Sequence, residues 1–285
     1  MEFKIGLAGK VIGITSMHEE IYEMCKEYLT DGTEDFHVMT SQADIEFERE
    51  KSIQEAVIEG IPPQDYPDDY LETLAVYRRI AVEMLRYDTM LMHGAVIGIR
   101  GDGGSDKRPE SEKLDALIGV EGDTKGAEGD GREDMMDAKG KAVLFTAQSG
   151  VGKTTHLRLW LDQIPGAFVV NGDKPLLRFQ DGNWQACGTP WAGKEGMQTN
   201  VIMPLSAICF LERGKQNEIE RVPFMEYYPL LFQQIYRSPE PESMIKTMEL
   251  LKKIGGTVPL FRLRCNMEPE AARVAFHGVF GEENE

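Results

Sequence analysis

A run of nine residues has the composition and spacing of a phosphate-binding loop. Residues 147–155 read AQSGVGKTT, and they lie between an apolar run at 142–145 and a helical pattern at 154–161. A strand, a glycine-rich turn and a helix N-terminus in that order direct backbone N–H groups at phosphate oxygens. In such a loop Lys153 reaches the β- and γ-phosphates, and the Thr154 hydroxyl holds Mg²⁺. We expect a nucleotide-binding P-loop with contacts from Gln148, Ser149, Gly150, Val151, Gly152, Lys153, Thr154 and Thr155.

The loop departs from the G-x-x-x-x-G-K-[ST] pattern at its first position, where Ala147 replaces glycine. Alanine there requires an αR or β backbone. The alternative interpretation is a chance Gly-Lys-Thr in a turn that starts a helix. The strand pattern before the loop and the helical pattern after it favour nucleotide binding.

A second turn offers the carboxylate that a magnesium site needs. Mg²⁺ takes oxygen ligands, and an aspartate at the tip of a strand beside the loop is the usual partner of the threonine hydroxyl. Asp173 follows the short apolar strand at 167–170 and is expected at that place. The alternative is a turn-forming aspartate in Asn171-Gly172-Asp173. Lys174 beside it would hold a phosphate or the substrate, or point into solvent.

The glycine-containing loop after residue 187 supplies further candidates. Lys194 is a candidate phosphate contact, because glycines near it permit a close approach of the backbone. Trp191 would stack on a ring of the ligand or serve as a buried anchor. His156 and Arg158, in the first turns of the helix after the P-loop, line the site or occupy ordinary helix positions.

Apolar runs and turn residues predict the elements that must position these side chains. Strands so outnumber helices after the P-loop that a mixed sheet is favoured over a regular βαβ array. Strands are expected at 3–7, 11–14, 36–39, 90–99, 141–145, 167–170, 176–179, 184–187, 201–211, 217–221 and 258–263. Further helices are expected at 19–29, 70–85, 224–236, 243–253 and 269–280.

The chain of 285 residues fits one large domain with a small appendage. The fold class is α/β (mixed α+β), with a small N-terminal α+β region at 1–88 and a nucleotide-binding domain at 89–285. Residues 101–140 are rich in Gly, Asp, Glu and Lys and poor in aromatic residues. That composition predicts a disordered insertion in an expanded hairpin turn.

Charge and apolar patterning exclude several classes of protein. A net charge of −17 argues against nucleic acid as a partner, because a phosphate backbone requires a basic face. No apolar run approaches the length of a membrane span, and the first residues do not resemble a signal peptide, so a cytoplasmic protein is expected. The 4 cysteines are scattered and suggest neither a zinc site nor disulfides. Whether the chain forms a homo-oligomer stays open.

Four pieces of sequence together resemble the C-terminal catalytic domain of HPr kinase/phosphorylase, and more closely an uncharacterised branch of that family with a phosphoenolpyruvate carboxykinase-like P-loop fold. They are His93-Gly94-Ala95, the loop at 149–154, Asn171 to Pro175, and Gly188-Thr189-Pro190-Trp191-Ala192-Gly193-Lys194. The resemblance covers somewhat under half of the chain. It implies an ATP- and Mg²⁺-dependent kinase that phosphorylates a hydroxyl of a protein or small molecule, with Lys153 and Asp173 as catalytic residues. No Asn-Lys-x-Asp guanine signature is present, so ATP is preferred over GTP.

One departure from the family bears on the mechanism. The relatives resemble Asn-Asp-Asp-Lys-Pro at the strand tip, whereas this chain has Gly172 at the first acidic position. The resemblance places the general base there, so the base is missing while the metal-binding Asp173 remains. Phosphoryl transfer depends mainly on positioning and charge neutralisation, so the loss slows the reaction without necessarily abolishing it. Three alternatives follow: a slow kinase, a kinase in which His93 is the base, and a catalytically weakened nucleotide-binding sensor or accessory protein.

Overall fold

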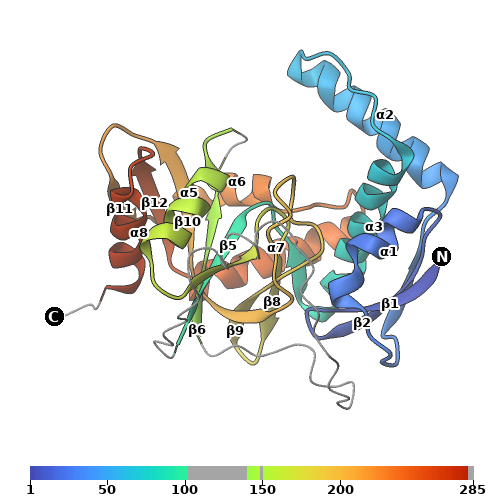
Figure 1. Cartoon of the computed structure of the whole chain (residues 1–285), viewed down its shortest axis with the longest axis horizontal. Coiled ribbons are helices and arrows are strands. Elements are labelled where there is room, and N and C mark those ends of the chain that lie inside the picture. Colours follow the sequence, from blue (N-terminus) through green and yellow to red (C-terminus); the bar gives the residue numbers. More distant parts are fainter. Residues whose placement is uncertain (102–139, 148–149, 282–285) are drawn as a thin grey trace.

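The structure, a computed structural model, describes residues 1–101, 140–147 and 150–281. It is a mixed α/β protein with two sheets, which confirms the expected fold class at that level (Figure 1). The predicted insertion at 101–140 lies outside the described residues except for its two end residues. In the described parts of the chain, no helix has both the length and the apolar composition to cross a membrane.

The N-terminal region is built on a sheet of three strands in the order β1-β2-β3. β1 (Glu2–Leu7) and β2 (Lys10–Thr15), both at predicted strand positions, form a hairpin, and β3 (Phe36–Met39) pairs with β2 in parallel. The helices of this region are α1 (Glu19–Met24), α2 (Gln42–Glu59) and α3 (Asp68–Met84). Short 3-10 turns follow at Lys26–Tyr28 and Leu85–Tyr87.

The second sheet has 9 strands, and its main path runs β4-β8-β9-β10-β6-β5-β7. The long strand β10 pairs antiparallel with β9 near its start and parallel with β6 and β12 farther along. This mixture of directions confirms the predicted mixed sheet. The strands are β4 (Thr89–Leu91), β5 (Ala95–Arg100), β6 (Gly140–Thr146), β7 (Ala167–Asn171), β8 (Leu176–Gln180), β9 (Asn183–Cys187), β10 (Ile202–Arg213), β11 (Glu218–Arg221) and β12 (Leu260–Cys265).

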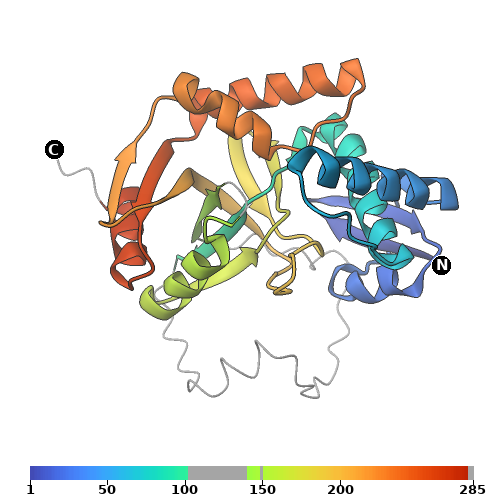
Figure 2. The same cartoon turned by 90° about the horizontal axis from the view of Figure 1, so that it is seen from above.

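Helices cover both faces of this sheet because its central strands are apolar on both sides. On β6, Leu144 packs toward α6 (Phe224–Gln234) and α7 (Pro241–Thr257), whereas the next residue, Phe145, packs toward α5 (Lys153–Gln163) and α8 (Glu270–Phe280). The two pairs of helices lie on opposite sides of the sheet in Figure 2, where α6 and α7 are orange, α5 yellow-green and α8 red. The glycine loop thus joins a central strand to a helix of a packed layer.

The two sheets share one hydrophobic cluster. Val76, Ile80 and Met84 of α3 are fully buried in a cluster that also contains Ile12 of β2 and Leu176 of β8. The predicted boundary near residue 88 therefore separates two sheets, while the apolar core crosses it. Burial of this kind stabilises each large side chain by roughly 1.5–3 kcal/mol.

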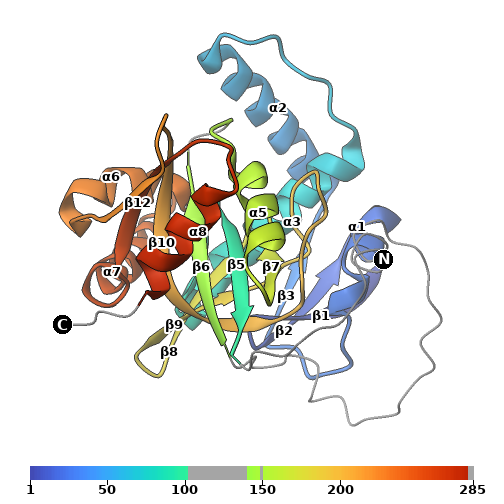
Figure 3. The same ribbon diagram turned by 60° about the vertical axis from the view of Figure 1, so that its left-hand side comes forward.

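Several elements differ from the sequence prediction: the helix predicted at 19–29 is α1 followed by a 3-10 turn, and two larger differences concern β4–β5 and α2. The predicted strand at 90–99 is divided into β4 and β5, because Met92 and His93 donate their backbone N–H groups to Pro175 and Gln234 instead of continuing one ladder. Helix α2 was not predicted. Its large apolar residues Val57 and Ile58 are 67% and 84% exposed, so they do not form the buried stripe by which a helix is recognised. In Figures 1 and 3, α2 projects from the rest of the molecule.

Candidate functional site

The glycine loop joins β6 to α5, in the predicted order of strand, loop and helix. Gly150 and Gly152 have φ values of 78° and 122°, which side chains rarely adopt. Among the described residues, no atom lies within 4 Å of the position that a Cβ would take on either glycine. Arg213 of β10 donates to the Gly150 carbonyl at 2.5 Å. The loop is held from one side and faces open space on the other, and its predicted contacts Gln148 and Ser149 lie outside the described residues.

Asn171 shapes the second turn of the site. Its fully buried side chain accepts hydrogen bonds from the backbone N–H groups of Asp173 (2.9 Å) and Lys174 (2.7 Å). Its Nδ2 donates to the carbonyl and the hydroxyl of Thr189, at 3.0 and 2.9 Å. The Thr189 hydroxyl in turn donates to the Lys174 carbonyl at 2.7 Å. This network joins the turn at 171–175 to the loop at 188–194, and it fixes the backbone at Asp173.

Asp173 lies between two cationic or ionisable groups. Its Oδ1 is 3.3 Å from His93 Nε2, and its Oδ2 is 3.3 Å from Lys174 Nζ. Burial acts to raise the pKa of Asp173, but the hydrogen bond from His93 and the charge of Lys174 outweigh burial and lower it. The carboxylate is therefore ionised at neutral pH. Asp173, His93 and Lys174 keep 28%, 33% and 24% of their side chains exposed, so each is reachable by a ligand.

Hydrogen bonds to three different parts of the fold hold the backbone around His93. Its N–H donates to the Gln234 carbonyl at 2.7 Å, and its own carbonyl accepts from the Thr146 hydroxyl at 3.0 Å. The next residue, Gly94, donates to the Asp173 carbonyl at 2.9 Å. The start of β5 is thus tied to both the end of β6 and the turn after β7, and the imidazole is held beside the carboxylate.

Lys153, the first residue of α5, interacts electrostatically with two of these side chains. It is half-buried, and burial lowers its pKa, while the charge of Asp173 raises the pKa and the charge of Lys174 lowers it further. Lys153 therefore lies within electrostatic reach of both side chains. Two ammonium groups against one carboxylate leave the cluster positively charged, which suits an anionic ligand.

The loop at 192–197 lies directly on the turn that carries Asp173. A Cβ on Gly172 would stand 2.9 Å from the Ala192 carbonyl oxygen, and a Cβ on Gly193 would stand 3.0 Å from Asp173 Cβ. Glycine at 172 is therefore required by the close approach of another backbone. The space that an acidic side chain would occupy at this position is filled by the main chain of the loop.

The remaining candidates lie in different surroundings. Trp191 is 4% exposed, and its ring centroid lies 5.8 Å from that of Tyr77. Its side chain is therefore a buried anchor and not a surface on which a ligand ring could stack. Lys194 is exposed on the loop at 192–197, which we call the covering loop. In the first turn of α5, Thr154 is half-buried and Thr155 is exposed. Arg158 pairs with Glu195 at 2.6 Å, which ties α5 to the covering loop.

His156 belongs to the core. It is 3% exposed, its Nε2 accepts from Trp160 Nε1 at 2.9 Å, and burial lowers its pKa to about 4. The imidazole is therefore neutral at physiological pH and packs against Phe145. The burial of His156 therefore supports an ordinary helix position and not a residue that lines the site.

Sequence reasoning missed two contributors to the site. Thr189 is fully buried and holds the turn, although it carries no charge that would draw attention to it. Tyr70, in the first turn of α3, stacks on Tyr66 with ring centroids 4.9 Å apart. Burial, then Tyr66, then the charge of Asp173 raise the pKa of the Tyr70 hydroxyl. The charge of Asp173 thus acts on a side chain of the N-terminal region, which no local pattern in the sequence indicates.

No cluster of three His, Cys, Asp or Glu side chains that could hold a metal ion occurs among the described residues. Thr154 and Asp173 would have to share a metal with oxygens of a bound nucleotide and water. Comparison of the whole sequence with models of known families and with curated proteins finds no match.

Proposed function

We propose that the protein is an ATP- and Mg²⁺-dependent phosphotransferase that acts on a hydroxyl of a protein or small-molecule acceptor. The observations that carry the proposal are the pairing of Asp173 with His93 and Lys174, and a glycine loop between a central strand and a helix that begins at Lys153. Phosphoryl transfer needs charge neutralisation and positioning above all, and this cluster provides both.

The residues present fit a triphosphate. Gly150 and Gly152 leave an open cradle where side chains would otherwise stand, and the helix N-terminus adds a partial positive charge. Burial makes the ammonium group of Lys153 costly without an anion, and a bound phosphate would supply one. Mg²⁺ suits the Thr154 hydroxyl and the Asp173 carboxylate, and when bound it would neutralise charge on the transferring group.

In this proposal His93 is the general base, because Gly172 has no side chain that could serve as one. The Nε2–H of His93 donates to Asp173 Oδ1, 3.3 Å away, so the other ring nitrogen, Nδ1, accepts the proton of the acceptor hydroxyl, and Asp173 stabilises the imidazolium that forms. The hydroxyl oxygen then forms the new bond to phosphorus as the bond to the nucleoside diphosphate breaks. Lys153 and Lys174 neutralise the charge that develops.

A second candidate is a nucleotide-binding sensor or accessory protein. The packing of Ala192 and Gly193 over Gly172 and Asp173 favours it, because the covering loop occupies space beside the carboxylate. A nucleotide that displaced this loop would change the surface around Lys194 and Glu195.

Transfer of a radiolabelled γ-phosphate separates the candidates. With Mg²⁺-ATP saturating, the kinase hypothesis expects release or transfer above the Lys153→Ala background, and a loss on the order of 10²-fold in His93→Gln. Lys252→Ala, on the exposed face of α7, is the matched control. Nucleotide binding without turnover would support the sensor, and absence of nucleotide binding would reject both.

A further inference from the structure

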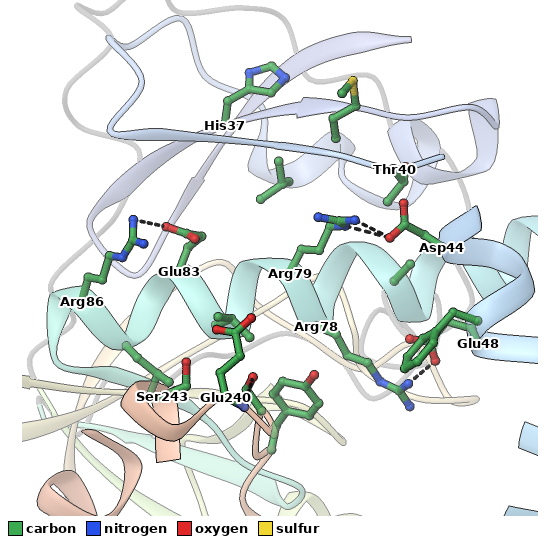
Figure 4. Close-up of a pocket in the computed structure, with 18 of the residues that line it drawn as sticks. His37, Thr40, Asp44, Glu48, Arg78, Arg79, Glu83, Arg86, Glu240 and Ser243 are labelled. Carbon is green, nitrogen blue, oxygen red and sulfur yellow. Dashed lines mark hydrogen bonds and ion pairs between the residues drawn. The ribbon is translucent and has the colours of Figure 1, made fainter. Parts of the chain in front are cut away.

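Helix α2 has one face that is fastened to α3. On this inner face Asp44 pairs with Arg79 and Glu48 pairs with Arg78. Figure 4 shows both ion pairs in the cavity that runs along α3. Ile45, beside Asp44, is fully buried. The acidic residues of the inner face are therefore neutralised by α3, and its large apolar residue is covered.

The opposite face of α2 carries large apolar side chains that contact solvent. Ile53 and Val57 are one turn apart, Ile58 follows Val57, and Phe47, which also lines the cavity, lies three turns before Ile58. These four, and Ile61 just beyond the helix, are between 42% and 84% exposed. Because α2 projects from the rest of the molecule in Figures 1 and 3, the other described elements leave this side uncovered. We call it the outer face of α2.

Exposed carboxylates border the outer face. Glu46, Glu50 and Glu55 are all exposed, and Glu50 forms no ion pair within the described part of the chain. The neighbouring cations are more covered than the acids with which they pair. Lys51 is 34% exposed against 58% for Glu55, and Arg49 is 27% exposed against 54% for Glu46. The outer face is therefore apolar with a negatively charged border.

We propose that the outer face of α2 binds a basic amphipathic helix of a partner protein. Such a helix repeats its apolar residues every three or four positions, which matches the spacing of Ile53, Val57 and Ile58. Lysine or arginine residues at its margins pair with the exposed carboxylates. Burial of the apolar side chains supplies affinity, and the charges select for a basic sequence. A contiguous apolar surface with a polar rim is typical of a protein interaction site.

A second copy of the chain is a poorer occupant of the same face. Pairing of α2 with α2 of another copy is isologous, so it brings the acidic border of one outer face near that of the other. Like charges that face each other oppose such pairing, and the net charge of −17 on each copy adds to the repulsion. The proposal is independent of nucleotide binding, because the candidate site contains no residue of the outer face.

Fluorescence polarisation with the full chain tests the proposal. The probe is a labelled peptide of two Leu-Lys-Lys-Leu-Leu-Lys-Leu repeats, which forms a basic amphipathic helix. A peptide of the same composition in scrambled order has no apolar face, and a third peptide has glutamate in place of lysine. We expect saturable binding of the first peptide, binding of the scrambled peptide that is about tenfold weaker or less, and none of the acidic peptide.

Two variants separate the apolar contribution from the charges. Val57→Gln/Ile58→Gln keeps good helix formers but removes apolar surface, so it should weaken binding of the basic amphipathic peptide about tenfold. Met225→Gln, at a residue of α6 that is 78% exposed, is the matched control and should leave binding unchanged. Glu50→Gln/Glu55→Gln should weaken binding severalfold and reduce its dependence on salt. Circular dichroism and thermal melting check that α2 and the fold are retained.

Three results would overturn the proposal. They are equal binding of the basic amphipathic and scrambled peptides, equal affinities of the Val57→Gln/Ile58→Gln and Met225→Gln proteins, and no binding at about millimolar protein. Sedimentation of the wild type as a dimer that Val57→Gln/Ile58→Gln dissociates would assign the outer face to a second copy instead.

Discussion

Asn171 and Thr189 are joined by a hydrogen bond of 2.9 Å from amide to hydroxyl, and both side chains are fully buried. One residue ends β7 and the other lies in the loop after β9. Through this bond a change in either turn is transmitted to the backbone that carries Asp173. The acidic residue is therefore positioned by two neutral ones.

Thr189→Val should destabilise the protein and weaken nucleotide binding together. The substitution keeps the volume of the side chain but removes the hydroxyl, so the Lys174 carbonyl and one Asn171 donor lose a partner, at a cost of about 1–3 kcal/mol. Urea unfolding and calorimetric titration with Mg²⁺-ATP measure the two effects. Thr257→Val, which removes an exposed hydroxyl at the end of α7, should change neither.

Lys153→Ala should weaken ATP binding by roughly 1.5–3 kcal/mol, because a charge-assisted contact with a phosphate is lost. Calorimetry on the purified variant gives the difference directly. The exposed Lys252→Ala serves as the control. Equal affinities for wild type and Lys153→Ala would contradict the phosphate-binding role of the loop.

Gly172→Ala should be destabilising by about 1–3 kcal/mol, because the added methyl group meets the Ala192 carbonyl at 2.9 Å. Gly172→Asp should move the covering loop for the same reason, so it does not simply restore an acid. In Gly256→Ala the new methyl group has no atom within 4 Å, and this helical position should gain slightly in stability. Thermal melts of the three variants test this; a Gly172→Ala protein as stable as wild type would mean that the loop yields freely.

His156 should make the protein sensitive to mild acid. Its pKa is lowered to about 4 by burial, so the unfolded state takes up the proton first as the pH falls below 6.5. Stability from this residue is complete above pH 6.5 and declines toward pH 4, by about 3 kcal/mol in total. In His156→Phe this part of the pH dependence should vanish, although the variant loses the acceptor of Trp160 Nε1. Urea titrations between these two pH values measure the slopes.

Local patterns in the sequence predicted most strands, because alternating apolar residues and turn residues such as Asp181 and Gly182 act over a few positions. The order of strand, glycine loop and helix around Lys153 is local in the same way. The bond from Asn171 to Thr189 is not, since two turns separated by a hairpin meet only after the sheet forms. Gly172 shows the limit most clearly: its identity is explained by Ala192 and Met197, which the sequence does not place beside it.

Helix α2 escaped prediction for a different reason. Four large apolar side chains of this helix are at least 42% exposed, so they do not mark one buried face. They are Phe47, Ile53, Val57 and Ile58. The helix is instead begun by a capping box between Ser41 and Asp44 and ended by Gly60 in a left-handed conformation. These end signals are short and common, and only tertiary structure distinguishes them.

The bridge between Arg158 and Glu195 gives the loop over Asp173 a dependence on ionic strength. Both side chains are exposed, at 62% and 44%, and such a pair contributes no more than about 1 kcal/mol in dilute buffer. Dissolved ions compete with it, since the screening length falls to about 8 Å at physiological salt. The exposure of the Asp173 side chain, which is 28% in the structure, should therefore rise with salt concentration, so that this carboxylate meets solvent more readily in a saline medium.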